Sequence, residues 1–395
     1  MILLIIIPIY IALNLYILHR VHKWLTACSK RFHSKWFVVP YIVIYSLLAL
    51  SLLFAFLLPS SGFQVLVKRI SNYWLGTFVY ILMFIAVADI LRLILKRIPG
   101  KVHDFFFSKV GYVFVGIFLT ALVGGMSAYG IAHSHIVKAN PYEVTIRNNC
   151  GDNSDLKVVL IADLHLGYSV GDRQMQRMVK KINEQDADLV VFAGDIFDNN
   201  FDALDNPERL EMLLSQINST YGTYAVFGNH DVTETLIAGF PISSKNAPRD
   251  PRMYEFLEKS NISVLEDETA IIDNSFYLTG RLDEKRTGNG TKKRASLDEL
   301  TKNLDPSMPL FVISHEPDHL SDYNAHSVDI VLSGHTHAGQ FFPLTIVQPF
   351  VWENYWGMKM IDSMYSFVTS GIGVYGPDMR VGTNSEVMVI DVHFE

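Results

Sequence analysis

The stretch LKVVLIADLH, residues 156–165, decides the fold because its character changes abruptly at its end. The run from Val158 to Ala162 is entirely apolar, which predicts a strand covered on both faces. Asp163 and His165 follow at once. In open α/β sheets the ligand crevice lies beyond the carboxyl ends of the strands, so this polar pair marks a candidate site.

The same pattern recurs along the second half of the chain. Apolar runs that end in polar residues return at ADLVVFAGD (187–195), TYAVFGNHD (223–231), LFVISHEPD (310–318) and DIVLSGHTH (329–337). Amphipathic segments that predict helices separate the earlier runs, at 173–185, 205–219 and near 251–260. Strands that alternate with helices indicate an α/β domain.

The residues that end these strands are oxygen and imidazole donors without a thiolate, a set that suits Mn²⁺, Zn²⁺, Fe or Mg²⁺. Seven donors are too many for one tetrahedral ion. They suit two ions about 3.5–4 Å apart that share a bridging carboxylate. The donors are Asp163, His165, Asp195, Asn229, His315, His335 and His337.

His335 and His337 stand two residues apart, so in an extended segment their rings face the same way and can each reach one ion. The flanking Gly334 and Gly339 let the backbone bend there and leave room for a substrate.

Five blocks carry a resemblance to a known family: DLH (163–165), GDIFD (194–198), GNHD (228–231), SHEPD around His315, and GHTH (334–337). In this order they resemble the motifs of the calcineurin-like metallophosphoesterase superfamily, and the chain is similar to its membrane-tethered bacterial phosphodiesterases. The resemblance covers roughly residues 155–393. It implies a four-layer αββα sandwich with the site at one edge.

The resemblance also implies a role for each residue. His230 would protonate the leaving alkoxide, and Asp198 would orient the ring of His230. A water that bridges two divalent ions would be the nucleophile, and Mn²⁺ is the first choice for these ions. Asp231, Glu316, Asp318 and His319 are interpreted as ordinary turn residues. Asp195 would bridge the ions, with Asp163, His165 and His337 on the first, and Asn229, His315 and His335 on the second.

The first third of the chain has a different composition. Four apolar runs are each about as long as the ~20 residues that a membrane-spanning helix needs: Met1–Leu18, Phe37–Leu58, Tyr73–Leu95 and Val110–Ala132. Asp89 and Arg92, three apart in the third run, are expected to pair. The predicted organisation is four transmembrane helices in 1–132, a linker and first strand in 133–154, and a metallophosphoesterase domain in 155–395.

Charge predicts the topology and excludes one class of partner. Basic residues gather in loops 19–36 and 96–109, so both loops are expected in the cytoplasm and the domain outside it, in a multi-pass membrane protein. Thirteen of the 33 basic residues but only two of the 40 acidic ones precede residue 141. Residues 141–395 therefore contain 20 basic and 38 acidic residues, a net charge of −18. Such a domain repels polyanions, which argues against nucleic acid as a partner.

The substrate is a phosphate ester on this interpretation, and two segments bear on its class. FFPLTIVQPFVWENYWGMK (341–359) is either ordinary core, the simpler interpretation, or an apolar lip beside the site. EKRTGNGTKKR (284–294) is either a solvated loop or a flap that meets phosphate. Both fit a lipid or envelope phosphodiester. Two alternatives stay open: a cytoplasmic-facing nucleotide–lipid pyrophosphatase, and a non-catalytic membrane sensor of metal or phosphate.

Overall fold

The computed structural model describes residues 3–59, 61–148, 150–151, 154–234, 236–237, 240–241, 247–290 and 292–395. The chain folds into two compact units. The helical unit comprises Met1–Ile131 with Leu236–Phe240 and Gly376–Asp378. The α/β unit comprises Ala132–Thr235, Pro241–Tyr375 and Met379–Glu395.

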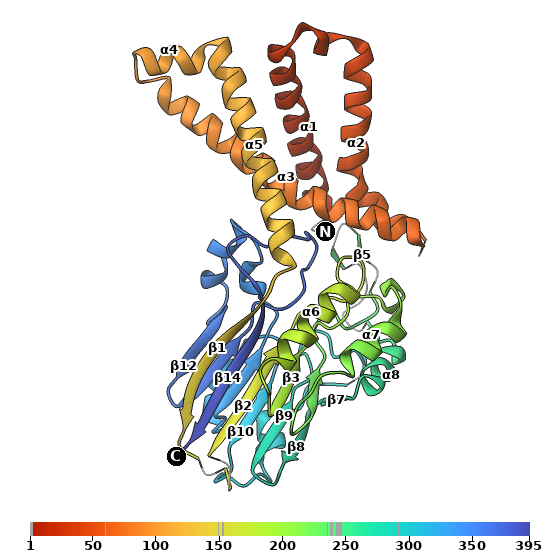
Figure 1. Ribbon diagram of the computed structural model, residues 1–395, viewed down its shortest axis with the longest axis vertical. Helices are drawn as coiled ribbons and strands as arrows, with labels where there is room; N and C mark the ends of the chain where they lie inside the picture. The colour runs from red at the N-terminus through yellow and green to blue at the C-terminus, as the bar shows by residue number, and fades with distance from the viewer. Residues whose placement is uncertain are drawn as a thin grey trace. The chain divides into compact units, whose positions relative to one another are not determined.

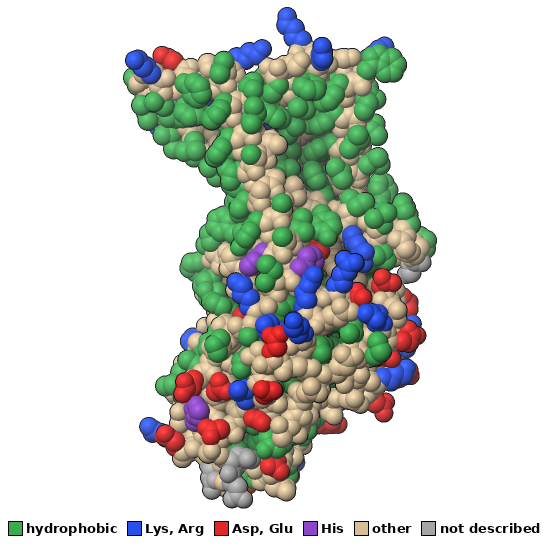
Figure 2. Space-filling view, viewed as in Figure 1, with side chains coloured by type: hydrophobic (Ala, Val, Ile, Leu, Met, Phe, Trp, Pro, Cys, Tyr) green, Lys and Arg blue, Asp and Glu red, His purple; other side chains and the backbone are tan. Residues whose placement is uncertain are grey.

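Among its described residues, the helical unit has four helices that are long and apolar enough to cross a membrane, which agrees with the four predicted runs. Hydrophobic side chains cover most of its visible surface, as expected for a surface that meets lipid (Figure 2). The four helices are α1 (Leu3–Cys28), α2 (Lys35–Leu57), α3 (Gly62–Leu95) and α5 (Lys109–Ser134), joined by η1 (Lys30–His33) and α4 (Lys101–Phe107).

One pairing predicted within this unit is wrong. Asp89 of α3 forms an ion pair with Arg20 of α1 and accepts a hydrogen bond from Tyr16, rather than pairing with Arg92. The guanidinium of Arg92 lies over the ring of Phe107, 5.0 Å from its centroid. Packing of α1 against α3 therefore supplies Asp89 with a partner that spacing along one helix does not predict.

The α/β unit contains two six-stranded sheets, which Figure 1 shows with helices over the first. The first sheet has the order β1 (Val137–Ile146), β14 (Ser385–Phe394), β2 (Asp155–Ile161), β3 (Leu189–Ala193), β4 (Thr223–Val226) and β7 (Ile262–Val264). The second has the order β12 (Gly357–Ile361), β13 (Met364–Val368), β11 (Ile330–Ser333), β10 (Leu310–Ile313), β9 (Phe276–Gly280) and β8 (Glu268–Ile272). A short pair, β5 (Leu236–Ile237) and β6 (Phe240–Pro241), stands apart.

The predicted four-layer sandwich is confirmed by what covers each sheet. The outer face of the first sheet packs against α6 (Asp172–Asn183), α7 (Pro207–Leu214) and α8 (Pro251–Lys259). The outer face of the second packs against residues of α9 (Leu297–Thr301) and α10 (Leu320–Ala325). The inner faces of the two sheets pack against each other.

Burial on both faces explains the unbroken apolar run of β2. Val159 and Ile161 belong to the core beneath the helices, whereas Val158 and Leu160 belong to the core between the sheets. Successive side chains of a strand point to opposite faces, so a strand with two covered faces needs every position apolar.

The register brings several chain segments to one edge of the first sheet. β2, β3 and β4 run parallel, and β14 runs antiparallel to β2, so β14 begins where β2 ends. β1 is parallel to β14, with Val137 opposite Ser385, so β1 begins at that edge too. The edge that carries the carboxyl ends of the parallel strands is therefore also the edge at which the chain enters the domain from α5.

The packing between the sheets generates a stability prediction. Phe311 of β10 is fully buried there, so Phe311→Ala leaves a cavity and should lower the free energy of unfolding by about 3–5 kcal/mol. Urea denaturation of the full-length protein in detergent measures it. Ile271→Ala on β8, where the side chain is 58% exposed, is the control. Equal losses in the two variants would contradict this account of the core.

Candidate metal centre

The predicted site residues all lie in loops that directly follow a strand of one of the two sheets. Their strands end at a common edge, so positions from 163 to 337 meet in space. The loops carry Asp163 and His165 after β2, Asp195 and Asp198 after β3, Asn229 and His230 after β4, His315 after β10, and His335 and His337 after β11.

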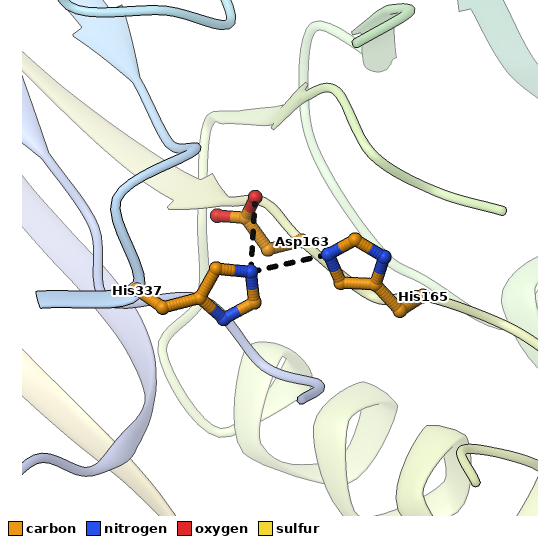
Figure 3. A group of neighbouring side chains, drawn as sticks. All are labelled: Asp163, His165 and His337. Carbon is orange, nitrogen blue, oxygen red and sulfur yellow. Dashed lines mark hydrogen bonds and ion pairs between the residues drawn. The ribbon is translucent and has the colours of Figure 1, made fainter. Parts of the chain in front are cut away.

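Three of these side chains form a first buried cluster. Figure 3 shows Asp163, His165 and His337 pointing toward a common point. The Nε2 atoms of the two histidines are 3.1 Å apart, and Nε2 of His337 is 3.6 Å from Oδ1 of Asp163. Two ring nitrogens at about 2.1 Å from one ion would have a similar separation, so this cluster fits a single cation.

A second cluster lies beside the first. Nε2 of His315 is 3.0 Å from Oδ2 of Asp195, 3.1 Å from Oδ1 of Asn229 and 3.2 Å from Nδ1 of His335. Oδ2 of Asp195 is also 3.8 Å from Nε2 of His165 in the first cluster. The carboxylate of Asp195 therefore stands between the two groups, where a bridging ligand has to be.

Backbone contacts hold the carboxylates and one imidazole in position. Oδ1 of Asp195 accepts the N–H of His230 at 2.7 Å, and both oxygens of Asp163 lie 3.0 Å from the N–H of His335. Nδ1 of His315 donates to the carbonyl of Ala193 at 2.8 Å. That bond fixes the tautomer in which Nε2 of His315 is left for a metal.

The ligand loops depend on left-handed backbone at several ligands and on close packing of one glycine against a ligand side chain. Five of the candidate ligands have left-handed backbone, with φ between 46° and 73°: Asp163, His165, Asp195, His335 and His337. Gly334 serves close approach, because a Cβ on it would lie 2.7 Å from Oδ2 of Asp163. Gly334 thus makes room for the carboxylate of Asp163, and the expectation that it leaves room for a substrate stays a prediction.

Burial sets the protonation of most of the imidazoles. It lowers the pKa of His165 to about 3 and the pKa values of His335 and His337 well below the usual range. These rings are therefore neutral near pH 7, as metal ligands must be. Burial likewise raises the pKa of Asp163 to about 8, and the charge of Asp195 adds to this.

Asp195 and His315 behave as an ion pair. Burial is the largest single effect and opposes ionisation of both groups, but the attraction between the two, together with that of neighbouring charged groups, outweighs it. The pKa of Asp195 is therefore held well below its ordinary value and that of His315 well above. Without a metal, one proton on His315 balances Asp195, and a divalent cation would take the place of that proton.

The ring of His230 has a partner that the resemblance did not imply. Nδ1 of His230 lies 2.7 Å from Oδ1 of Asn199, a buried asparagine that directly follows Asp198. Asn199 has left-handed backbone (φ 57°), which turns its side chain toward His230. Asn199 is therefore a further candidate for orienting His230, and the role of Asp198 stays a prediction.

Three contributors to the site were missed. Asp231, interpreted as a turn residue, is buried and accepts the N–H groups of Phe197 and Gly228 at 2.7 Å, which ties the loops after β3 and β4 together. The ring of Trp352 lies 5.1 Å from that of His335, and the ring of Tyr375 lies 4.4 Å from that of His230. Asp231 stood within a motif and Trp352 within the segment 341–359 that was considered as a lip beside the site, but neither was predicted as a contact of a ligand or of His230.

The basic segment 284–294 lines an open pocket of about 880 Å³. The nearest link to the metal centre is Lys285, whose Nζ lies 5.7 Å from the ring of Trp352 and which pairs with Glu316, the residue after His315. The pocket's cationic side chains are Arg281, Lys285, Lys292, Lys293 and Arg294. The pocket is also lined by Glu284, Asp298 and Asp322, so its charge is mixed.

Comparison with known proteins yields relatives that share this domain. The chain is 28% identical over 246 residues to an uncharacterized metallophosphoesterase of Campylobacter jejuni, covering 60% of this chain and 59% of that protein. It is 26% identical to a zebrafish (Danio rerio) transmembrane protein with metallophosphoesterase domain, covering 79% and 70% of the two chains. It is 26% identical to the UDP-2,3-diacylglucosamine pyrophosphatase LpxG of Chlamydia trachomatis, covering 47% and 64%.

Residues 156–339 match the family model for calcineurin-like phosphoesterase, a family of phosphoric ester hydrolases. The matched range begins at β2 and ends just after His337, so it contains every candidate ligand described above. This part of the chain is therefore a calcineurin-like metallophosphoesterase domain.

Proposed function

We propose that this protein is a membrane-anchored phosphoesterase that hydrolyses phosphate esters at a pair of divalent metal ions. The observation that carries the proposal is the carboxylate of Asp195, 3.0 Å from His315 in one donor cluster and 3.8 Å from His165 in the other. The donor set of carboxylates, imidazoles and one amide suits Mn²⁺, with Zn²⁺, Fe and Mg²⁺ as alternatives. Such a pair supplies a nucleophilic hydroxide and a Lewis acid.

The ligand assignment follows the two clusters. Asp163, His165 and His337 would hold the first ion, and Asn229, His315 and His335 the second, with Asp195 on both. Asp163 and Asp195 bring two negative charges against four positive ones. The centre is therefore cationic inside an acidic domain, and it attracts a phosphate.

His230 is suited to handle the proton of the leaving oxygen. Its Nδ1 is engaged by Asn199 and its backbone N–H by Asp195, so ring and backbone are both fixed beside the metal ligands. Nε2 is then the atom that exchanges a proton. A general acid held in this way contributes about 10²–10⁴-fold to rate.

For the membrane topology, we propose that the domain lies outside the cytoplasm, since the basic loops 19–36 and 96–109 are of the kind retained inside. A domain on the cytoplasmic side that cleaves a nucleotide–lipid pyrophosphate is the second candidate. The similarity to LpxG, named as a pyrophosphatase, favours the chemistry of that alternative. A reporter enzyme fused after Glu395 separates the two topologies.

Replacement of the shared carboxylate tests the proposal directly. Asp195→Asn should lower kcat for bis-p-nitrophenyl phosphate with Mn²⁺ by more than about 100-fold, because even outer partners of metal ligands contribute 10–100-fold. Asp186→Asn is the matched control, since Asp186 is exposed, precedes β3 and has φ 51°, which asparagine tolerates. Turnover that survives in Asp195→Asn would reject Asp195 as the shared ligand of a dinuclear centre, and a wild type without turnover would favour the non-catalytic sensor.

The ionisation of the centre predicts the pH dependence of metal binding. A metal ion must displace the proton of His315, and near pH 7 also that of Asp163, whose pKa is about 8. The association constant for Mn²⁺ should therefore rise from about pH 6 to about pH 8, by up to tenfold per pH unit for each proton displaced. Isothermal titration in buffers of different ionisation enthalpy measures affinity and proton release together. A flat profile would contradict the assigned protonation states.

The contact with Asn199 gives a prediction that separates positioning from metal binding. Asn199→Ala removes the partner of His230 and should lower kcat by about tenfold or more, with the affinity for Mn²⁺ nearly unchanged. Asn199→Asp keeps an acceptor and should restore much of the rate. If Asn199→Ala instead weakens Mn²⁺ binding as strongly as Asp195→Asn does, the residue supports the ligand loops rather than His230.

A further inference from the structure

An exposed apolar surface lies directly after the last metal-ligand loop. It consists of two short turns, η4 (Leu344–Ile346) and η5 (Gln348–Phe350), and no charged residue occurs from Phe341 to Trp352. Phe350 is 85% exposed. Six apolar side chains, each at least 37% exposed, form what we call the apolar ridge: Phe342, Leu344, Ile346, Val347, Phe350 and Val351. Soluble surfaces carry scattered apolar residues, but a contiguous apolar group of this kind marks an interaction site.

The apolar ridge packs against the loop that carries His335 and His337. Gly339, two residues after His337, packs so closely under η4 that a Cβ on it would lie 2.7 Å from Cα of Thr345. At the other end, Trp352 contacts His335 edge to face. The apolar ridge therefore lies beside the loop that carries two candidate metal ligands.

The apolar ridge and the membrane anchor are connected to the same edge of the α/β unit. The last residues of α5 belong to that unit, and the carbonyl of Ser134 accepts hydrogen bonds from Oγ of Ser385 at 2.7 Å and from Nε2 of Gln174 at 3.3 Å. Gln174 also donates to the carbonyl of Ile372, whose N–H donates to Ala162, the neighbour of Asp163. The end of a helix with the length and composition of a membrane span is thus hydrogen-bonded to the edge that carries the site.

We propose that the apolar ridge enters the lipid–water interface of the bilayer that anchors the chain, and that the metal centre acts on phosphate esters borne by lipids at headgroup depth. The bilayer is the occupant within reach, since two residues separate α5 from β1. Lys285, with its side chain 60% exposed, adds a cation beside Trp352, and cationic groups next to apolar ones are typical of membrane-surface contacts. The substrate class rests on the proposed phosphoesterase function, whereas the location of the apolar ridge does not.

Spin labelling tests the location without any activity. In the full chain with Cys28→Ser, Phe350→Cys carries a nitroxide, and the buried Cys150 stays native. In vesicles of phosphatidylethanolamine and phosphatidylglycerol, power saturation should show that oxygen reaches the label better than a water-soluble nickel chelate does. The matched label is Ile271→Cys, 58% exposed on β8, which should show the reverse.

Nickel access at position 350 equal to that at position 271 would overturn the proposal. So would dipolar broadening at position 350 that disappears on dilution with unlabelled protein, since it would assign the apolar ridge to a second copy of the chain.

A substrate pair tests the chemical class. Hexadecyl p-nitrophenyl phosphate in vesicles and methyl p-nitrophenyl phosphate in water share one reacting group and differ in the apolar tail. The wild type should prefer the hexadecyl ester by at least about tenfold in kcat/KM, a difference of about 1.4 kcal/mol. Phe350→Ser should remove that preference and leave the methyl ester unaffected, and Met212→Ser, at a side chain 50% exposed on α7, should change neither.

Equal kcat/KM for the two esters would reject the lipid-borne class. If neither ester is hydrolysed, the proposed function fails, and the spin labels still decide where the apolar ridge lies.

Discussion

The metal centre depends on a negative charge that the protein buries and then has to balance. Asp195 is almost fully buried, with one oxygen held by a backbone N–H and the other facing two imidazoles. An unbalanced carboxylate in such a place would cost several kcal/mol, so the fold has to provide a counter-charge. A proton on His315 does so in the metal-free protein. The same geometry accepts a divalent ion in exchange, because the surrounding histidines are kept neutral by burial.

Much of this arrangement was predictable from local patterns. Burial on both faces requires unbroken apolar strands, and ligand residues occur where those strands end, so the four-layer sandwich and the position of the centre follow from runs such as residues 156–165. Length and composition sufficed for the four membrane-spanning candidates. The grouping of Asp163 with His337, 174 positions later, follows from the rule that parallel strands present their carboxyl ends at one edge.

The residues that were not predicted are those whose roles depend on contacts made only in the folded chain. Asn199 has left-handed backbone and contacts Nδ1 of His230, and no pattern of residue types predicted that contact. Arg20 reaches Asp89 because two helices pack, not because of any spacing along one of them. Trp352 and Tyr375 lie outside every motif and reach the centre only through the fold.

The left-handed backbone at Asp163, His165, Asp195, His335 and His337 has an evolutionary consequence. Each such non-glycine residue disfavours the folded state by about 1–2 kcal/mol, and five of them together approach the whole stability of an ordinary domain, about 5–15 kcal/mol. Glycine at any of these positions would relieve the penalty and abolish a ligand. In homologues that no longer need the metal, substitutions that stabilise the fold at these positions would also remove the ligands. The ligand set is therefore expected to be lost quickly once selection for it ends.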